Sequence, residues 1–303
     1  MKNEVFEKSA KPKEDGDKYK FSVLMAVYHK EVPEFFDTAI ESILCRQTLR
    51  PNEFVLICDG PLTKELDDVL KKYENLFPNI TRIYRLDKNG GLGNALAFGL
   101  SKCTYSLIAR ADSDDLCDST RFEKQIEFLR KNPKVDVLGT FIEEFDTDYK
   151  LPVNQKVLPT THDDICKMAT FRNPINHMTV MFKKEIIIKC GSYQHLPYLE
   201  DYYMWVRAIE NGATLSNLDE YLVHARIGNG MVQRRSNKKY IESWKILNQY
   251  MLKHKMVSIG KYFRNLLLIR LFVYMPVSLK GLVYKNILRR KVLGFERDPK
   301  ATV

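Results

Sequence analysis

Residues 108–115 read Ile-Ala-Arg-Ala-Asp-Ser-Asp-Asp, so three carboxylates, Asp112, Asp114 and Asp115, follow directly on an apolar run. The run, residues 105–111, predicts a short strand that carries the acids at its carboxyl end. So much like charge within four positions repels itself unless a cation lies among the oxygens. Mg²⁺ and Mn²⁺ prefer carboxylate oxygen and are usually held by one or two carboxylates together with substrate phosphates. The stretch therefore indicates a metal-assisted reaction on a phosphorylated substrate, with an ordinary turn or helix cap as the alternative.

Apolar runs and helical patterns alternate around this stretch. They predict strands at 21–28, 53–58, 80–86 and 135–141, and helices at 33–47, 62–76 and 91–102. Such alternation is typical of an α/β fold, a mostly parallel sheet with helices on both faces. Ligands of these sheets bind outside the carboxyl ends of the strands. Asp59 directly follows the second strand, so we expect it at the same edge as the acidic cluster.

The glycine-rich stretch Asn89-Gly-Gly-Leu-Gly-Asn94 does not match the phosphate-binding motifs that it suggests. The dinucleotide fingerprint requires a further glycine where this chain has Leu96, and it belongs to the first strand-to-helix turn rather than the third. The Lys-Ser/Thr pair of a P-loop is also missing. We interpret the stretch as a turn that lets a ligand approach the backbone closely, or as a plain helix start.

Beyond residue 150 the pattern is looser. It predicts a strand at 176–182, a helix at 199–210, and an extended segment at 214–223 that ends in His224-Ala-Arg226. Gly228, Gly230, Arg234 and Arg235 then predict a mobile loop that can fold over a charged ligand.

Positive charge is concentrated near the C-terminus. The net charge is +10, yet residues 243–295 carry eleven Lys and Arg and no Asp or Glu, so the other 250 residues carry a net charge of −1. The segment also contains an apolar run, 266–277, which is interrupted by Arg270 and is too short to span a bilayer. This mixture predicts a helix that lies on an anionic membrane surface, and it argues against nucleic acid as the partner. A core helix with a solvated basic face is the alternative.

No targeting segment is evident. Residues 1–19 have mixed charge and no apolar signal region, so we expect a disordered tail. The six cysteines lack C-x-x-C spacing, which favours reduced thiols over a disulfide or zinc framework.

Taken in order, these pieces resemble glycosyltransferase family 2, inverting nucleotide-sugar enzymes of the GT-A fold. The resemblance covers about residues 20–230 and is carried by FSVLMAVYHK, Asp59, NGGLGNA, ARADSDD with the helix RFEKQIEFL, NPINHMTVMF and LEDYYMW. Within the family the chain is most similar to bacterial enzymes that assemble O-antigen, capsule and exopolysaccharide on a lipid carrier. The resemblance implies a catalytic domain over 20–235, with a nucleotide-sugar half (about 20–118) and an acceptor half (about 119–235). A basic helical membrane-associating extension would follow over 236–303.

The resemblance also implies roles for single residues. Ala26, Val27, Tyr28 and Asp59 would line the nucleoside pocket, and Asn94 and Arg110 would contact the ribose or diphosphate of the donor. Asp112 and Asp114 match the D-x-D pair that holds a divalent metal, Mn²⁺ or Mg²⁺, with Asp112 also touching the donor. Asp201 aligns with the general base. Second-tier candidates are Asp115, Glu200, His177, His224 and Arg226.

The implied activity is transfer of one sugar, with inversion to a β linkage, from a UDP-galactose or UDP-glucose type donor to a lipid-linked (undecaprenyl diphosphate) saccharide. We expect the enzyme to act peripherally at the cytoplasmic side of the bacterial inner membrane. Processive members of the family carry Q-x-x-R-W, and the nearest equivalent here, from His224 to Ile227, lacks both Gln and Trp. A nucleotidyltransferase would need a glycine- and lysine-rich loop after the first strand, which residues 28–31 do not supply. A non-catalytic nucleotide-sugar-binding membrane-peripheral protein remains open.

Overall fold

The structure is a computed structural model, and it describes residues 16–228, 237–276 and 279–280. Most of the expected tail and the expected loop residues Gly230, Arg234 and Arg235 lie outside the described residues, as does the end of the C-terminal extension. Residues Gly16–Tyr19 form a short 3-10 helix, η1, directly before the first strand.

The strands are β1 (Phe21–Val27), β2 (Glu53–Cys58), β3 (Thr81–Arg85), β4 (Leu107–Arg110), β5 (Leu116–Cys117), β6 (Val137–Phe145), β7 (Asn154–Lys156), β8 (Met181–Lys183) and β9 (Leu215–Arg226). The helices are α1 (Pro33–Leu44), α2 (Lys64–Leu76), α3 (Leu92–Lys102), α4 (Arg121–Lys131), α5 (His162–Ala169), α6 (Lys184–Lys189), α7 (Glu200–Glu210), α9 (Lys238–Lys253) and α10 (Ile259–Tyr274). A second 3-10 helix, η2, covers His177–Thr179.

All nine strands form one sheet in the order β3-β2-β1-β4-β8-β6-β9-β5, with β7 beside β6. The parallel arrangement predicted from the sequence holds for β3-β2-β1-β4 and again for β6 with β9. The sheet as a whole is mixed, because β8 runs antiparallel to both β4 and β6. In the chain β8 follows α5 and η2, and it enters the sheet between β4 and β6 in the direction opposite to both. The expected strand at 176–182 is shorter than predicted, and its first residues form η2.

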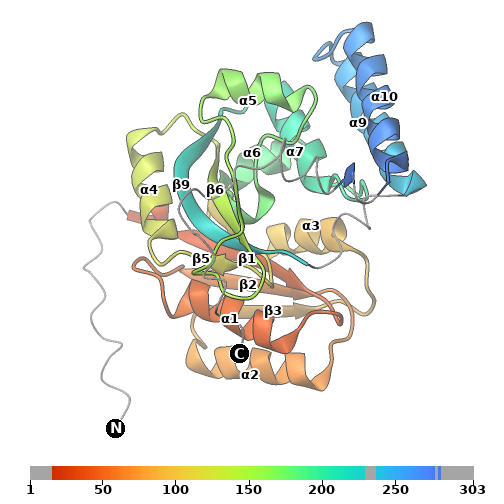
Figure 1. The fold of residues 1–303 in the computed structure, drawn as a ribbon. Helices are drawn as coiled ribbons and strands as arrows, with labels where there is room; N and C mark the ends of the chain where they lie inside the picture. Colours follow the sequence, from red (N-terminus) through yellow and green to blue (C-terminus); the bar gives the residue numbers. More distant parts are fainter. Residues whose placement is uncertain (1–15, 229–236, 277–278, 281–303) are drawn as a thin grey trace.

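The sheet is buried on both faces. Alternate residues of β1 point to opposite sides, so Val23 and Met25 pack with α1, α2 and α4, and Leu24 and Ala26 pack with α3, α5, α6 and α7. In Figure 1, α1 and α2 lie on one side of the sheet and α6 and α7 on the other. Gly99 lets α3 sit directly on the sheet, because a Cβ there would lie 2.5 Å from Leu24 Cδ1 and 2.8 Å from Ile57 Cγ1.

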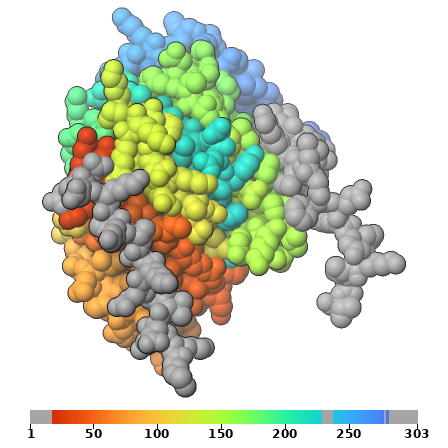
Figure 2. All heavy atoms as spheres, turned by 90° about the vertical axis from the view of Figure 1, so that its left-hand side faces the viewer, coloured from red at the N-terminus to blue at the C-terminus, as the bar shows by residue number. Residues whose placement is uncertain are grey.

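The helices α9 and α10 form a separate layer on α7. A third apolar cluster joins Tyr202 and Val206 of α7 to Leu247 of α9 and Ile269 of α10. These helices lie at the end of the molecule opposite to α2 (Figures 1 and 2). None of the helices in the described part of the chain has the length and apolar character needed to cross a bilayer.

Candidate active site

The strands β1, β2 and β4 are parallel, so the residues that follow them meet at one edge of the sheet. Tyr28 follows β1, Asp59 follows β2, and the acidic stretch follows β4. The strand β9 reaches the same edge, because it is parallel to β6 while β8 is antiparallel to both β4 and β6. A cavity of about 470 Å³ lies at the other end of these strands, between Tyr19 and Tyr105, and is separate from the acids.

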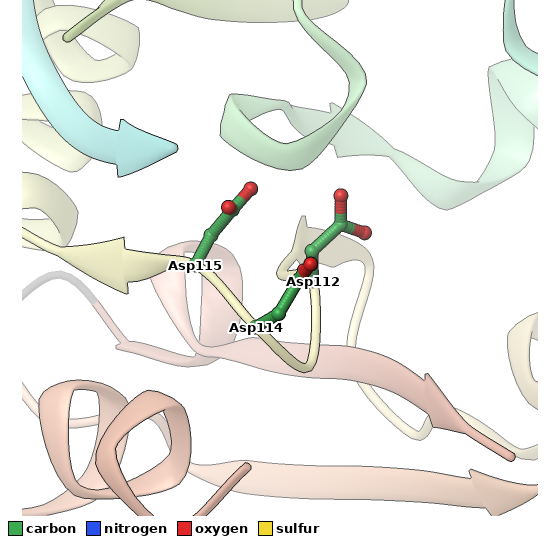
Figure 3. A group of neighbouring side chains, drawn as sticks. All are labelled: Asp112, Asp114 and Asp115. Carbon is green, nitrogen blue, oxygen red and sulfur yellow. The ribbon is translucent and has the colours of Figure 1, made fainter. Parts of the chain in front are cut away.

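Asp112, Asp114 and Asp115 form a cluster on the loop between β4 and β5 (Figure 3). One carboxylate oxygen from each residue lies within 4.8 Å of the others. Two ligands of one Mg²⁺ lie at most about 4.2 Å apart, twice its ~2.1 Å bond, so small side-chain rotations would bring these oxygens onto one ion. The donor set is all oxygen, which suits Mg²⁺ or Mn²⁺. The residues therefore fit a divalent cation.

Arg110 contacts this cluster through Asp112, and its side chain is almost fully buried. It forms an ion pair with Asp112, while its buried Nε has no hydrogen-bond partner among the described residues. Burial lowers the pKa of Arg110, because the charged form loses its hydration. The positive charge of Arg110 therefore stabilises negative charge at the cluster.

Asp115 and Arg226 connect the cluster to the end of β9. The backbone N–H of Arg226 donates to Asp115 Oδ1 at 2.9 Å, and the guanidinium lies between the rings of Phe35 (3.7 Å to the centroid) and Phe145 (4.6 Å). Burial raises the pKa of Asp115 well above its usual range, and the charge of Asp114 adds to the shift. A bound divalent cation would reverse this, since it stabilises ionised carboxylates.

Glu31 is a member of the site that the sequence did not single out. It lies in the loop after β1, and its Oε2 accepts a 2.5 Å hydrogen bond from Ser113 Oγ, in the middle of the acidic loop. Burial raises the pKa of Glu31, with Asp114 as a smaller cause in the same direction. Glu31 therefore fixes the loop from the side of β1.

Asp59 holds the glycine-rich turn. Its two carboxylate oxygens accept from the backbone N–H groups of Gly90 (2.7 Å) and Gly91 (2.9 Å). Gly91 has φ +87° and precedes α3, so the stretch does start a helix. Asn94 Nδ2 donates to Gly90 O at 2.8 Å. The predicted nucleoside-binding residues are thus adjacent: Ala26 and Val27 end β1, and Asp59 N donates to Val27 O at 2.8 Å.

Asp201 occupies the first turn of α7, as predicted, and has a partner that the sequence did not reveal. Asn173 Nδ2 donates to Asp201 Oδ2 at 2.7 Å, and no hydrogen bond reaches Oδ1 within the described parts of the chain. Its neighbour Glu200 lies against α3, because a Cβ at Gly93 would be 3.0 Å from Glu200 Cγ. The start of α7 therefore faces the start of α3, beside the glycine-rich turn.

The two histidines occupy different surroundings. His177 Nε2 lies 2.9 Å from Tyr193 Oη, and its ring contacts Trp205. Burial lowers the pKa of His177 well below its usual range, and the positive charge of Arg110 adds to the shift. His224 lies on β9 with its Nδ1 3.4 Å from Glu143, and burial lowers its pKa as well. His177 is thereby placed within reach of the charge of Arg110, whereas His224 lies opposite Leu116, the residue that follows Asp115.

Known proteins resemble this chain in sequence. The family model described as "Glycosyl transferase family 2" matches residues 22–192. The amylovoran biosynthesis glycosyltransferase AmsE of Erwinia amylovora is 40% identical over 269 residues, covering 88% of this chain and 98% of that protein. An Escherichia coli UDP-Gal:alpha-D-GlcNAc-diphosphoundecaprenol beta-1,3-galactosyltransferase is 36% identical over 275 residues, covering 90% and 98%.

Solved structures show the same fold. TarS of S. aureus, residues 1–349 in complex with UDP-GlcNAc, superposes with a TM-score of 0.63 over 88% of this chain and 76% of that one, at 18% identity. The fold is therefore GT-A, as the sequence predicted. Together with the family match, it shows that the chain belongs to glycosyltransferase family 2.

Proposed function

We propose that the protein transfers one hexose, with inversion to a β linkage, from a UDP-sugar to a lipid-diphosphate-linked saccharide in the assembly of a bacterial surface polysaccharide. A galactose or glucose donor is preferred. Among the relatives, one is named for amylovoran biosynthesis and another for galactosyl transfer to GlcNAc-diphosphoundecaprenol. These names support the substrate classes, and the geometry of the acidic site supports the chemistry.

The observation that carries the proposal is the cluster of three carboxylates beside the buried Arg110. Asp114 and Asp112 would hold Mn²⁺ or Mg²⁺. The ion would neutralise the diphosphate of the leaving nucleotide. Arg110, whose charge lies against Asp112, would contact the same diphosphate, and Asp115 would steady the loop through its bond to the backbone of Arg226.

The nucleoside would lie along the end of β1 and β2. Ala26, Val27 and Tyr28 would line its pocket, and Asp59 would accept a hydrogen bond from the base. Each carboxylate oxygen can accept more than one hydrogen bond, so the contacts of Asp59 to Gly90 and Gly91 leave acceptor capacity. Asn94, at the start of α3, would reach the ribose.

Asp201 would take the proton of the acceptor hydroxyl. A general base must keep its orientation while one oxygen remains available. Asn173 supplies the orientation at Oδ2 and leaves Oδ1 open. Glu200, His177, His224 and Arg226 would act on the diphosphate or the acceptor, or position the residues that do.

The chain lacks a Q-x-x-R-W sequence, which supports transfer of a single sugar. The acceptor is carried on lipid, so the protein would work at the cytoplasmic side of the bacterial inner membrane as a peripheral protein. A non-catalytic nucleotide-sugar binder would share the donor site but release no UDP.

The test is UDP release by the purified protein with Mn²⁺, a UDP-hexose and a lipid-linked saccharide. Asp114→Asn and Asp201→Asn should each lower turnover by at least about 100-fold, because removal of a metal ligand or general base typically costs 10²–10⁴-fold. Asp219→Asn, an exposed carboxylate on β9 away from the site, is the matched control and should keep wild-type activity.

Both variants should stay folded, since the substitutions are isosteric, and Asp114→Asn should melt no lower than wild type because it relieves the repulsion with Asp115. Wild-type turnover in Asp114→Asn would remove that residue from the metal site. Wild-type turnover in Asp201→Asn would remove the assignment of the base.

A further inference from the structure

The outer face of α10 carries a continuous apolar stripe. Ile259, Phe263, Leu267, Leu271 and Tyr274 follow one another at helical spacing, and each is between 56% and 71% exposed. Large apolar side chains exposed in a row are unusual on a protein surface, whereas single ones are common. The stripe therefore indicates a surface that is covered in use.

The stripe is distinct from the side of α10 that packs on the protein. Asn265, Ile269 and Val273 face inward and are buried, and Ile269 and Val273 belong to the apolar cluster with α7 and α9. Asn265 Nδ2 also donates to Thr170 O at 2.7 Å. The orientation of α10 is thus fixed, and the outward stripe is not needed for folding of the core.

A cationic groove lies beside the stripe. Its volume is about 430 Å³, and it is lined by Cys166, Lys167, Thr170, Phe171, Lys261 and Arg264, from α5, the turn after it, and α10. Lys167 is paired with Asp164 at 2.9 Å. Lys261 and Arg264 have no carboxylate partner within the described residues. Their own helix offers none, because residues 243–295 contain no Asp or Glu.

We propose that α10 lies in the interface of an anionic lipid bilayer, with the stripe among the acyl chains and the groove on lipid phosphates. An apolar stripe flanked by unpaired Lys and Arg is the pattern of interfacial helices. The amphipathic ring of Tyr274 favours the depth of the headgroups. Charge complementarity favours an anionic bilayer, rather than a second copy of the chain, as the partner that covers the stripe. Pairing two stripes face to face would bring Lys261, Arg264 and Arg270 of both copies together without counter-charges.

Two hydrogen bonds and three residues of chain link α10 to the candidate base. Thr170, which accepts from α10, lies three residues before Asn173, which holds Asp201. The inference thus rests on the proposed function for its purpose: the docked face places the acceptor half of the site beside the membrane that holds a lipid-linked acceptor.

The experiment measures binding of the full chain to vesicles of phosphatidylcholine, with and without phosphatidylglycerol, by flotation. We expect binding to the anionic vesicles that weakens with salt. Lys261→Gln with Arg264→Gln should weaken it by about 30-fold, since each basic residue at the surface contributes about fivefold. Phe263→Gln with Leu271→Gln should weaken it by at least about tenfold.

Matched controls come from equally exposed residues elsewhere. Leu76→Gln with Leu151→Gln tests loss of exposed apolar area, and Lys64→Gln with Lys131→Gln tests loss of charge. Both controls should bind like wild type. Sedimentation of the free protein should give a monomer.

Equal binding by the α10 variants and wild type, or equal binding to neutral and anionic vesicles, would overturn the proposal. So would a dimer that Phe263→Gln with Leu271→Gln dissociates. UDP release with a water-soluble, short-chain acceptor separates this proposal from the proposed function. The α10 variants should keep full turnover in that assay. Normal turnover without vesicle binding refutes only the docking surface, and vesicle binding without any turnover refutes only the transferase.

Discussion

Replacing Asn173 with alanine removes the hydrogen bond that fixes the candidate base. The bond joins Asn173 Nδ2 to Asp201 Oδ2 at 2.7 Å, a length typical of a bond to a charged acceptor. Such bonds contribute about 1.5–3 kcal/mol. If the whole contribution serves to orient Asp201, turnover falls by about 10-fold to about 150-fold, at ~1.36 kcal/mol per tenfold.

The expected signature is a lower kcat with an unchanged KM for the UDP-sugar, because within the described residues Asn173 bonds Asp201 and the backbone of Ile175, and neither is assigned to the nucleotide. Steady-state kinetics with saturating acceptor measures both. Asn211→Ala is the matched control: Asn211 lies at the other end of the same helix and donates to Arg207 O at 2.9 Å. It should lower the free energy of unfolding by about 1 kcal/mol, as expected for a bond to a neutral carbonyl, and leave kcat alone. A kcat within twofold of wild type in Asn173→Ala, or a loss confined to KM, would refute the reasoning.

Three further predictions concern stability. Burial lowers the pKa of His177 in the folded protein, whereas the unfolded chain binds a proton below about pH 6.5, so stability falls as the pH drops. From pH 7.5 to 5.5, the difference in the free energy of unfolding between wild type and His177→Gln, measured in urea, should shrink by up to about 1.4 kcal/mol. A constant difference would argue against a neutral buried ring. Gly99→Ala should destabilise the protein by about 1–3 kcal/mol, because its Cβ would overlap Leu24 and Ile57. Gly260→Ala should not, because a Cβ there meets no atom within 4 Å. Equal melting temperatures for the two variants would contradict the packing of α3. Arg226→Ala should lower the free energy of unfolding by about 1–2 kcal/mol, because the contacts of the guanidinium with Phe35 and Phe145 are lost. Arg226→Lys should restore only part of that stability. Full restoration by lysine would show that the planar guanidinium is not needed.

The parts of the site that were predictable from the sequence are those encoded locally. An apolar run followed by acids places Asp112–Asp115 at a strand end, and the same reasoning places Asp59. The position of Asp201 in the first turn of a helix was also encoded locally, although its role came from the family resemblance. Glu31 was not singled out, and Asn173 was quoted only as part of NPINHMTVMF without a role, because their partners, Ser113 and Asp201, are distant in sequence.

The C-terminal segment illustrates a different limit. Its apolar run was consistent with either a core helix or a membrane-surface helix, because both give the same periodic signal. The structure shows that α10 has one buried side, which includes Ile269 and Val273, and one exposed side, which includes Leu267 and Leu271. The direction of β8 was likewise not predictable from the sequence, because a short apolar run indicates a strand but not the neighbouring strand with which it pairs.

The central claim is transfer of one hexose from a UDP-sugar to a lipid-linked saccharide. Mass spectrometry of the acceptor after incubation with the protein, Mn²⁺ and UDP-galactose or UDP-glucose tests it most directly. We predict a single product heavier by one hexose, formed in step with UDP release and absent with Asp114→Asn. No change in acceptor mass with any UDP-hexose, or a ladder of products carrying several sugars, would contradict the account.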